Sequence, residues 1–353
     1  MFQYAAVAGA GAAAAAAGAA GAGSGAAGAG TGIAGIGAAR TGAAGATGTE
    51  SGAVGAGGVP GVQGGRGGDG RRRGKEVATY VFVTGANGVA AADPELTLRG
   101  HRTVGVSLPG HGPEEQFHRA YQAPQDLAEL ATRPSPMAGV TLDDYVEATV
   151  DAVRRVSGHG PVILVGGSLG GATITKAADV VPDLIDLLVY DTAFCCTRLR
   201  SPNDYLSTPE GKESLAANVV AGIVADPAVI GALRVNWRTN DGEFLRAVKA
   251  AFMAEASEGE LLAMLNTLLP DESLQVGSAD ARGHKEAWGR VPRVYIRHTR
   301  DRMIPLALQD RMIKDADATT PDNTFKVFSV EASHAPTAET YRQITEILHK
   351  LAR

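Results

Sequence analysis

The stretch VGGSLGG (165–171) places one serine in a glycine-rich turn directly after an apolar run. Residues 166–170 fit the pattern G-x-S-x-G, in which the serine occupies a tight turn from a strand to a helix. The glycines on either side let strand and helix approach closely. The N–H of Leu169 then lies at the start of the helix, where it can donate to an oxyanion. Ser168 is therefore predicted to be a nucleophile.

A serine nucleophile needs a base and an acid, and both follow in the order that this kind of turn requires. Asp301 comes just after one predicted strand, and His334 comes just after the last one. We expect His334 to take the proton of Ser168 and return it to the leaving group. Asp301 would fix the imidazole tautomer and stabilise the imidazolium. Asp191 also ends a predicted strand, and it is an alternative acid or a polar residue that lines the site.

The same glycines are also compatible with a phosphate-binding loop, but neither common pattern fits. A Walker loop counted from Gly166 needs a lysine where Ala172 stands. The dinucleotide fingerprint G-x-G-x-x-G needs a glycine where Ser168 stands. The turn at 166–170 is therefore predicted to hold a nucleophile and not a phosphate.

A second glycine-rich loop, VTGANGVAA (83–91), resembles the nucleotide-binding opening of short-chain dehydrogenases. Such a loop would hold a pyrophosphate at a helix N-terminus. No tyrosine in the sequence has a lysine four residues later, and Pro94 is expected to interrupt the helix that the loop requires. A dehydrogenase that binds NAD(P) stays an alternative, and the main prediction is a protein without a cofactor or a metal site.

Strands and helices alternate along most of the chain. Strands are predicted over 77–85, 161–167, 184–191, 292–299 and 324–330, and residues 103–112 are predicted to form a strand and a Pro/Gly loop. Helices are predicted over 141–156, 169–180, 305–317 and 336–352. The strand at 161–167 is apolar without alternation, so both of its faces should be covered, as in a parallel sheet between helix layers. The fold class is therefore a doubly wound α/β sheet, whose sites lie at the carboxyl ends of the strands.

These residues resemble the α/β-hydrolase superfamily, in the branch of small esterases, plant methyl-ester hydrolases and hydroxynitrile lyases. The matching motifs are SLPGHG, VGGSLGG, WGRVPRVYIRHTRDRMIP, LQDRMI and SHAP, in this order along 77–353. The resemblance implies an α/β-hydrolase fold, with Ser168, Asp301 and His334 as nucleophile, acid and base. Residues 195–290 contain helical stretches but no clear strand, and are predicted to form a helical cap inserted between two strands.

Two departures from the family pattern lie near the serine. The family commonly has His-Gly after the first central strand, where this chain has TGANG (84–88). By position, the Ala86 N–H would be the second oxyanion donor beside that of Leu169, and Asn87 could add a side-chain donor. Gly167 stands where the family often has a histidine or another larger residue. It leaves room beside the nucleophile or loosens the turn.

The composition divides the chain into two parts. Residues 1–76 hold 25 of the 46 glycines and are predicted to be a disordered low-complexity segment. Residues 77–353 carry 27 basic and 35 acidic side chains without a basic stripe, which argues against nucleic acid. After residue 76, no stretch reaches the roughly 18 consecutive apolar residues that a membrane span needs. The adjacent Cys195 and Cys196 suit a reducing compartment, so we predict a cytoplasmic location over secretion.

Together these observations predict a carboxylic ester hydrolase that acts on an ester, thioester or lactone with an apolar portion. A lyase, or another non-hydrolytic reaction on the same three residues, is the first alternative. A ligand-binding protein with an impaired site is another, because the loop at 84–88 departs from the family pattern.

Overall fold

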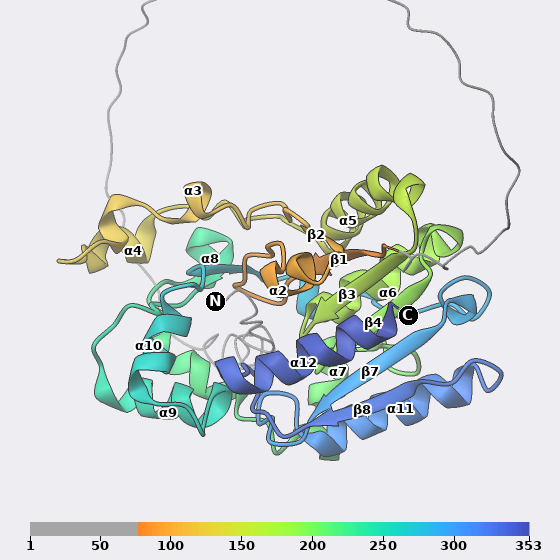
Figure 1. Cartoon of the computed structure of the whole chain (residues 1–353). Helices are drawn as coiled ribbons and strands as arrows, with labels where there is room; N and C mark the ends of the chain where they lie inside the picture. Colours follow the sequence, from red (N-terminus) through yellow and green to blue (C-terminus); the bar gives the residue numbers. More distant parts are fainter. Residues whose placement is uncertain (1–76, 353) are drawn as a thin grey trace, which may run out of the picture. The chain divides into compact units, whose positions relative to one another are not determined.

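A computed structural model of the chain describes residues 77–352 (Figure 1). The predicted low-complexity segment 1–76 lies outside the described residues. Six strands form one sheet in the order β2-β1-β3-β4-β7-β8, and every neighbouring pair is parallel. The strands are β1 (Thr79–Val83), β2 (Arg102–Gly105), β3 (Val162–Gly167), β4 (Leu187–Asp191), β7 (Arg293–His298) and β8 (Lys326–Val330). The predicted α/β fold class is confirmed.

Helices cover both faces of the sheet. One layer contains α5 (Leu142–Val156), α6 (Gly170–Val180) and α11 (Leu306–Thr319), and the other contains α2 (Pro94–Leu98) and α12 (Ala338–Leu351). Successive side chains of a strand point to opposite faces. Val81 of β1 accordingly packs in the core with α5 and α6, whereas Tyr80 and Phe82 pack with α12. Burial on both faces explains why β3 shows no polar alternation.

The helix starts follow from local sequence. The Thr141 hydroxyl accepts from the N–H of Asp144 at the start of α5, and the Asp144 carboxylate accepts from the N–H of Thr141, as the sequence predicts. Pro94 does not interrupt a helix, which corrects one expectation. It is the first residue of α2, where a proline costs no hydrogen bond, and Asp93 caps that helix through the N–H of Leu96.

The segment predicted to be the cap, residues 195–290, lies between β4 and β7. It contains α7 (Pro202–Leu206), α8 (Pro227–Ile230), α9 (Gly242–Phe252) and α10 (Glu258–Leu265). Before it, the chain forms α3 (Pro113–Gln116) and α4 (Leu127–Thr132). Short 3₁₀ turns are η1 (Arg119–Tyr121), η2 (Ser157–His159), η3 (Pro182–Leu184), η4 (Pro209–Gly211), η5 (Ala216–Gly222), η6 (Val276–Ser278) and η7 (Trp288–Arg290).

The expectation of no strand in the cap segment is wrong. The strands β5 (Ala232–Arg234) and β6 (Asp271–Ser273) pair antiparallel. Each strand has only three residues and carries buried charged side chains, so no alternation of apolar and polar residues indicates a strand in the sequence. The Arg234 guanidinium donates to both carboxylate oxygens of Asp271 at 2.6 Å each, which joins the two strands through a buried ion pair.

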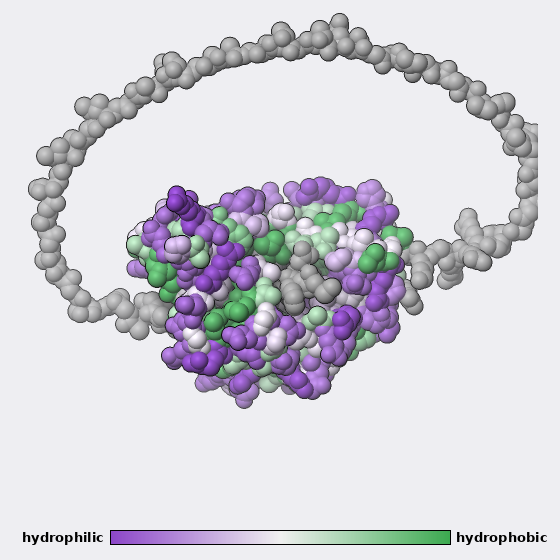
Figure 2. All heavy atoms as spheres, turned by 60° about the vertical axis from the view of Figure 1, so that its left-hand side comes forward, coloured by the Kyte–Doolittle hydropathy of each residue, from purple (hydrophilic) through white to green (hydrophobic). Residues whose placement is uncertain are grey.

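Polar and charged residues cover most of the face seen in Figure 2, and hydrophobic residues gather there in small groups. The large hydrophobic side chains that the described residues expose most are Leu98 and Val229, on α2 and α8. Among residues 77–352, no helix combines the length and apolar character that a membrane crossing needs.

Candidate active site

Ser168 lies in the turn between β3 and α6, and its φ of 53° is unusual for a residue other than glycine. The turn needs its glycines because backbones meet there. A Cβ on Gly166 would lie 2.8 Å from the carbonyl oxygen of Gly170, and one on Gly170 would lie 2.5 Å from that of Thr84. The predicted close approach of strand and helix is thus present, and it also brings the loop after β1 against the start of α6.

The three residues predicted to form a triad meet at the carboxyl edge of the sheet. The Nε2 atom of His334 lies 3.1 Å from Oγ of Ser168, and its Nδ1 atom lies 2.6 Å from Oδ2 of Asp301. A carboxylate oxygen only accepts, so Nδ1 carries the proton in a neutral ring. Nε2 is then free to accept the serine proton. The side chains of Asp301 and His334 are fully buried.

Asp301 is held from several sides. Its Oδ1 atom accepts from the N–H groups of Met303 at 2.6 Å and Ile304 at 2.9 Å. Its Oδ2 atom accepts from the Thr192 hydroxyl at 2.5 Å as well as from His334. Thr192 has a φ of 38°, which is strained for a β-branched residue. Sequence reasoning missed Thr192, although its position directly after a predicted strand end was an available signal.

Asp191 does not contact His334, which corrects its interpretation as an alternative triad acid. Its Oδ1 atom lies 3.0 Å from Nε2 of His298, and the other ring nitrogen of His298 lies 2.8 Å from the carbonyl oxygen of Ser333. Burial opposes a charge on this ring, but Asp191, Asp301 and the Ser333 carbonyl outweigh that effect and raise the pKa of His298. A second buried Asp–His pair therefore supports the backbone next to His334.

The two predicted oxyanion donors lie at neighbouring points of the site. Leu169 directly follows Ser168, and Ala86 lies in the loop after β1, which the close approach at Gly170 brings to the turn. The side chain of Asn87 differs from expectation. Its amide nitrogen donates to the carbonyl oxygen of Leu269 at 2.9 Å, so it binds the cap segment. Gly167 ends β3 and is buried.

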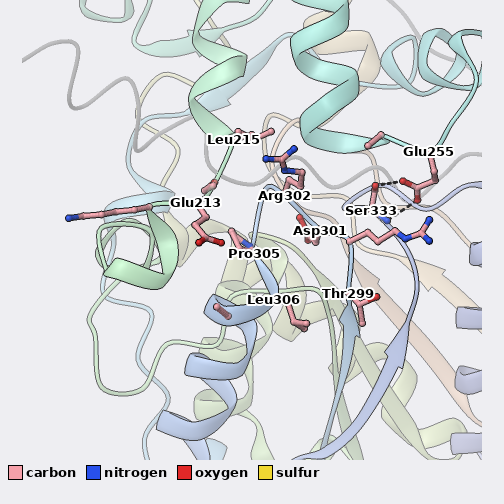
Figure 3. Close-up of a pocket in the computed structure, with 14 residues that line it drawn as sticks. Glu213, Leu215, Glu255, Thr299, Asp301, Arg302, Pro305, Leu306 and Ser333 are labelled. Carbon is pink, nitrogen blue, oxygen red and sulfur yellow. Dashed lines mark hydrogen bonds between the residues drawn. The ribbon is translucent and has the colours of Figure 1, made fainter.

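The cap segment also contacts the loop of the histidine. The Glu255 carboxylate accepts from the N–H of Ser333 at 2.9 Å and from its hydroxyl (Figure 3). The N–H of Ala335 donates to the carbonyl oxygen of Phe252 at 2.9 Å. The ring of Phe252 meets that of His334 edge to face, with centroids 5.9 Å apart. Sequence reasoning missed Glu255 because a charged residue just after a helix is usually solvated.

A cleft of about 800 Å³ opens beside these residues. Asp301, Arg302, Glu255 and Ser333 lie on its wall, and Pro305 and Leu306 at the start of α11 form another part (Figure 3). Within residues 77–352, no group of three or more His, Cys, Asp or Glu side chains is arranged to hold a metal ion.

Comparisons with known proteins agree with this architecture. The model of the alpha/beta hydrolase family matches residues 80–346. "Putative methylesterase 11, chloroplastic" from Arabidopsis thaliana is 25% identical over 241 residues, which are 65% of this chain and 56% of that protein. "Pyrethroid hydrolase" from Sphingobium wenxiniae is 24% identical over 288 residues, 78% of this chain and 88% of that protein.

Solved structures share the fold. The crystal structure of a pyrethroid hydrolase from Sphingobium faniae superposes with a TM-score of 0.54 at 22% identity, and the match covers 78% of this chain and 97% of that one. The family model spans most of the described region and includes Ser168, Asp301 and His334. The chain therefore belongs to the alpha/beta hydrolase family.

Proposed function

We propose that this protein is a serine hydrolase that cleaves carboxylic esters, including thioesters or lactones, through an acyl-enzyme. The observation that carries the proposal is the pair of hydrogen bonds that joins Ser168 to His334 at 3.1 Å and His334 to Asp301 at 2.6 Å. They have the connectivity of a nucleophile, a general base and an orienting acid. The names of two relatives, a methylesterase and a pyrethroid hydrolase, fit this class.

The geometry translates into two half-reactions. Oγ of Ser168 attacks the carbonyl carbon while Nε2 of His334 accepts its proton, and the carbonyl oxygen becomes an oxyanion. The N–H groups of Ala86 and Leu169 donate to that oxyanion. Collapse of the tetrahedral intermediate breaks the bond to the alcohol, which takes the proton from Nε2. Water then attacks the acyl group by the same sequence and releases the acid, so Ser168 recovers its proton.

The surroundings of the base favour a substrate with an apolar portion. The Phe252 ring lies against the His334 ring, so apolar surface borders the reacting atoms. Apolar lining with few polar points is typical of sites for small molecules. Small esters with an aliphatic or aromatic acyl or alcohol group are the proposed substrate class.

The test is turnover of a series of p-nitrophenyl esters from acetate to dodecanoate. Ser168→Ala should lower kcat on the order of 10⁶-fold, as loss of a triad serine does. The matched control is Ser329→Ala, because Ser329 is an exposed serine on β8 whose hydroxyl accepts from the Arg297 side chain. This control should retain wild-type turnover. Equal activity of wild type and Ser168→Ala would refute the proposal.

Covalent labelling separates the alternatives. A fluorophosphonate probe should modify Ser168 in the wild type, as located by mass spectrometry. Absence of labelling would favour a ligand-binding protein with an impaired site. Labelling without ester turnover, but with Ser168-dependent cleavage of a hydroxynitrile, would favour a lyase.

A further inference from the structure

We propose that Glu272, a carboxylate on the cap segment, is the positioning residue of the oxyanion loop 84–88 and fixes the direction of the Ala86 N–H through Asn87. The inference rests on the proposed hydrolase function, since only an acyl-transfer reaction uses this loop as an oxyanion donor. Nothing in the sequence near residue 272 marks this role, because the two residues lie 185 positions apart.

The contacts between Asn87 and the cap segment define the peptide that follows Ala86. The N–H of Asn87 donates to Oε2 of Glu272 at 2.7 Å. The carbonyl oxygen of Asn87 accepts from the N–H of Leu269 at 2.8 Å, and its side-chain amide donates back to the Leu269 carbonyl oxygen. The indole N–H of Trp237 donates to that same oxygen at 2.9 Å, which anchors Leu269 in turn. Asn87 is thus held at its N–H, its carbonyl and its side chain.

The loop is a tight turn that needs such support. The N–H of Gly88 donates to the carbonyl oxygen of Gly85 at 3.3 Å, and Asn87 at the third position of the turn has a φ of 56°. Asparagine is among the few residues that adopt this left-handed conformation at small cost. With the Asn87 N–H fixed by Glu272, rotation about the Ala86 backbone is restricted. The N–H of Ala86 on the opposite side of that residue therefore keeps one direction.

The burial of Glu272 shows that this carboxylate belongs to a built network. Only 2% of the residue is exposed, and Oε1 accepts from the Tyr145 hydroxyl at 3.1 Å and from the N–H of Ser273 at 2.9 Å. The Tyr145 oxygen also lies 2.7 Å from Nε2 of His111, whose Nδ1 donates to the carbonyl oxygen of Gly88 at 2.6 Å. The network therefore starts and ends on the oxyanion loop.

Hydrogen bonds explain how the interior tolerates this carboxylate. Burial and the neighbouring Glu272 raise the pKa of Tyr145, so the phenol keeps its proton. The N–H groups of Asn87 and Ser273 and the Tyr145 hydroxyl all donate to the Glu272 carboxylate, and such hydrogen bonds reduce the cost of burying it.

The experiment compares Glu272→Ala, Glu272→Gln and, as a control on the cap segment, Glu243→Ala by steady-state ester hydrolysis. Loss of an oxyanion donor costs about 10²–10³-fold in kcat. A donor that is present but loosened in Glu272→Ala should cost roughly 10–100-fold in kcat, with KM within about 3-fold. Glu272→Gln keeps an oxygen for the Asn87 N–H and should recover most of that loss. Glu243→Ala removes an exposed carboxylate from the first turn of α9, which shares no hydrogen bond with Asn87 or Glu272, and should retain kcat.

A second readout excludes a merely structural effect. Affinity for a trifluoromethyl ketone, whose serine adduct carries an oxyanion, should weaken in Glu272→Ala by the same factor as kcat/KM. Affinity for the matching alcohol, which makes no oxyanion, should stay within about 3-fold, because binding that does not involve the oxyanion is unaffected. Where thermal melting shows that Glu272→Ala does not fold, Glu272→Asp replaces it. Its shorter side chain withdraws the carboxylate from Asn87 and should still lower kcat about 10-fold.

The outcomes separate this inference from the proposed function. Ser168-dependent turnover in the wild type with an unchanged kcat in folded Glu272→Ala, or in Glu272→Asp, overturns the role of Glu272 and leaves the hydrolase intact. Equal loss of affinity for the ketone and the alcohol also overturns it. Absence of Ser168-dependent turnover in the wild type overturns both.

Discussion

The buried pair of Asp191 and His298 predicts a pH dependence of stability that a single substitution should remove. Both ring nitrogens of His298 face acceptors, the carboxylate of Asp191 at 3.0 Å and the carbonyl oxygen of Ser333 at 2.8 Å. Both hydrogen bonds can form only when the ring carries two protons. Asp301 and the amide of Gln309 also border this residue, and within residues 77–352 no basic side chain hydrogen-bonds to it. The folded protein therefore favours the imidazolium.

The sign and the size of this pH dependence follow from the difference in pKa of His298 between the folded and unfolded states. The pKa of His298 is raised in the folded state, whereas an unfolded histidine titrates near about 6.5. Between those two values the folded state holds one more proton than the unfolded state. Stability therefore falls with rising pH by up to about 1.4 kcal/mol per unit and levels off above the folded pKa. Below about pH 6.5 the Asp191–His298 pair makes its full contribution to the free energy of unfolding. Breaking a buried ion pair costs about 3–5 kcal/mol under such conditions.

Chemical unfolding of the wild type and His298→Gln, followed by the fluorescence of the buried tryptophans, measures this difference. We expect this difference, measured from about pH 5.5 to about pH 9, to be largest below about pH 6.5, to shrink as the pH rises through the raised folded-state pKa of His298, and then to level off. His284→Gln is the control, because its ring is 67% exposed although it pairs with Asp179. It should change the free energy of unfolding by less than about 1 kcal/mol at any pH. A difference between wild type and His298→Gln that is constant across this range would refute the reasoning.

Three further substitutions test the contacts around the site. Thr192→Val removes one donor to Asp301 without changing shape and should lower kcat about 10-fold, because a hydrogen bond to a charged group contributes roughly 1.5–3 kcal/mol; an unchanged kcat would assign Thr192 no part in orienting the acid. Gly170→Ala puts a Cβ 2.5 Å from a backbone oxygen and should destabilise the fold by about 1–3 kcal/mol, read as a fall in Tm; a wild-type Tm would contradict the close approach. Glu255→Ala leaves the N–H of Ser333 without its acceptor, so the fold-decrease in kcat should exceed the fold-increase in KM. A change confined to KM would assign Glu255 to substrate binding.

The fold was predictable because each central strand is a buried apolar run followed by a glycine, proline or polar turn. The same feature located the site. Ser168, Asp301 and His334 each follow the end of a strand, and parallel strands bring those ends to one edge. The observed boundaries of the elements differ from the predicted ones by only a few residues. In the strand predicted at 184–191, for example, a 3₁₀ turn occupies 182–184 and β4 begins at Leu187.

The remaining features were not predictable because they depend on contacts between distant segments. The pairs Asn87–Glu272 and Ser333–Glu255 join residues 185 and 78 positions apart, and no periodicity encodes such a pairing. The strands β5 and β6 are too short for a pattern and are held by a buried ion pair. The residue type of Asn87 suggested a side-chain donor to the oxyanion. The direction of its amide towards Leu269 depends on how the cap segment folds.

These distant contacts give the cap segment a positioning role in the proposed mechanism. Two carboxylates of the cap segment each accept from a backbone N–H, Glu255 beside the proposed base and Glu272 beside the proposed oxyanion donor. A displacement of the cap of even about 1 Å would misplace both the proton acceptor and the oxyanion donor, and errors of that size cost about 10²-fold. In the proposed mechanism, the cap segment thus helps to position the reacting groups. Substitutions that disturb its packing should therefore lower kcat, whereas those that only reshape its apolar lining should act on KM.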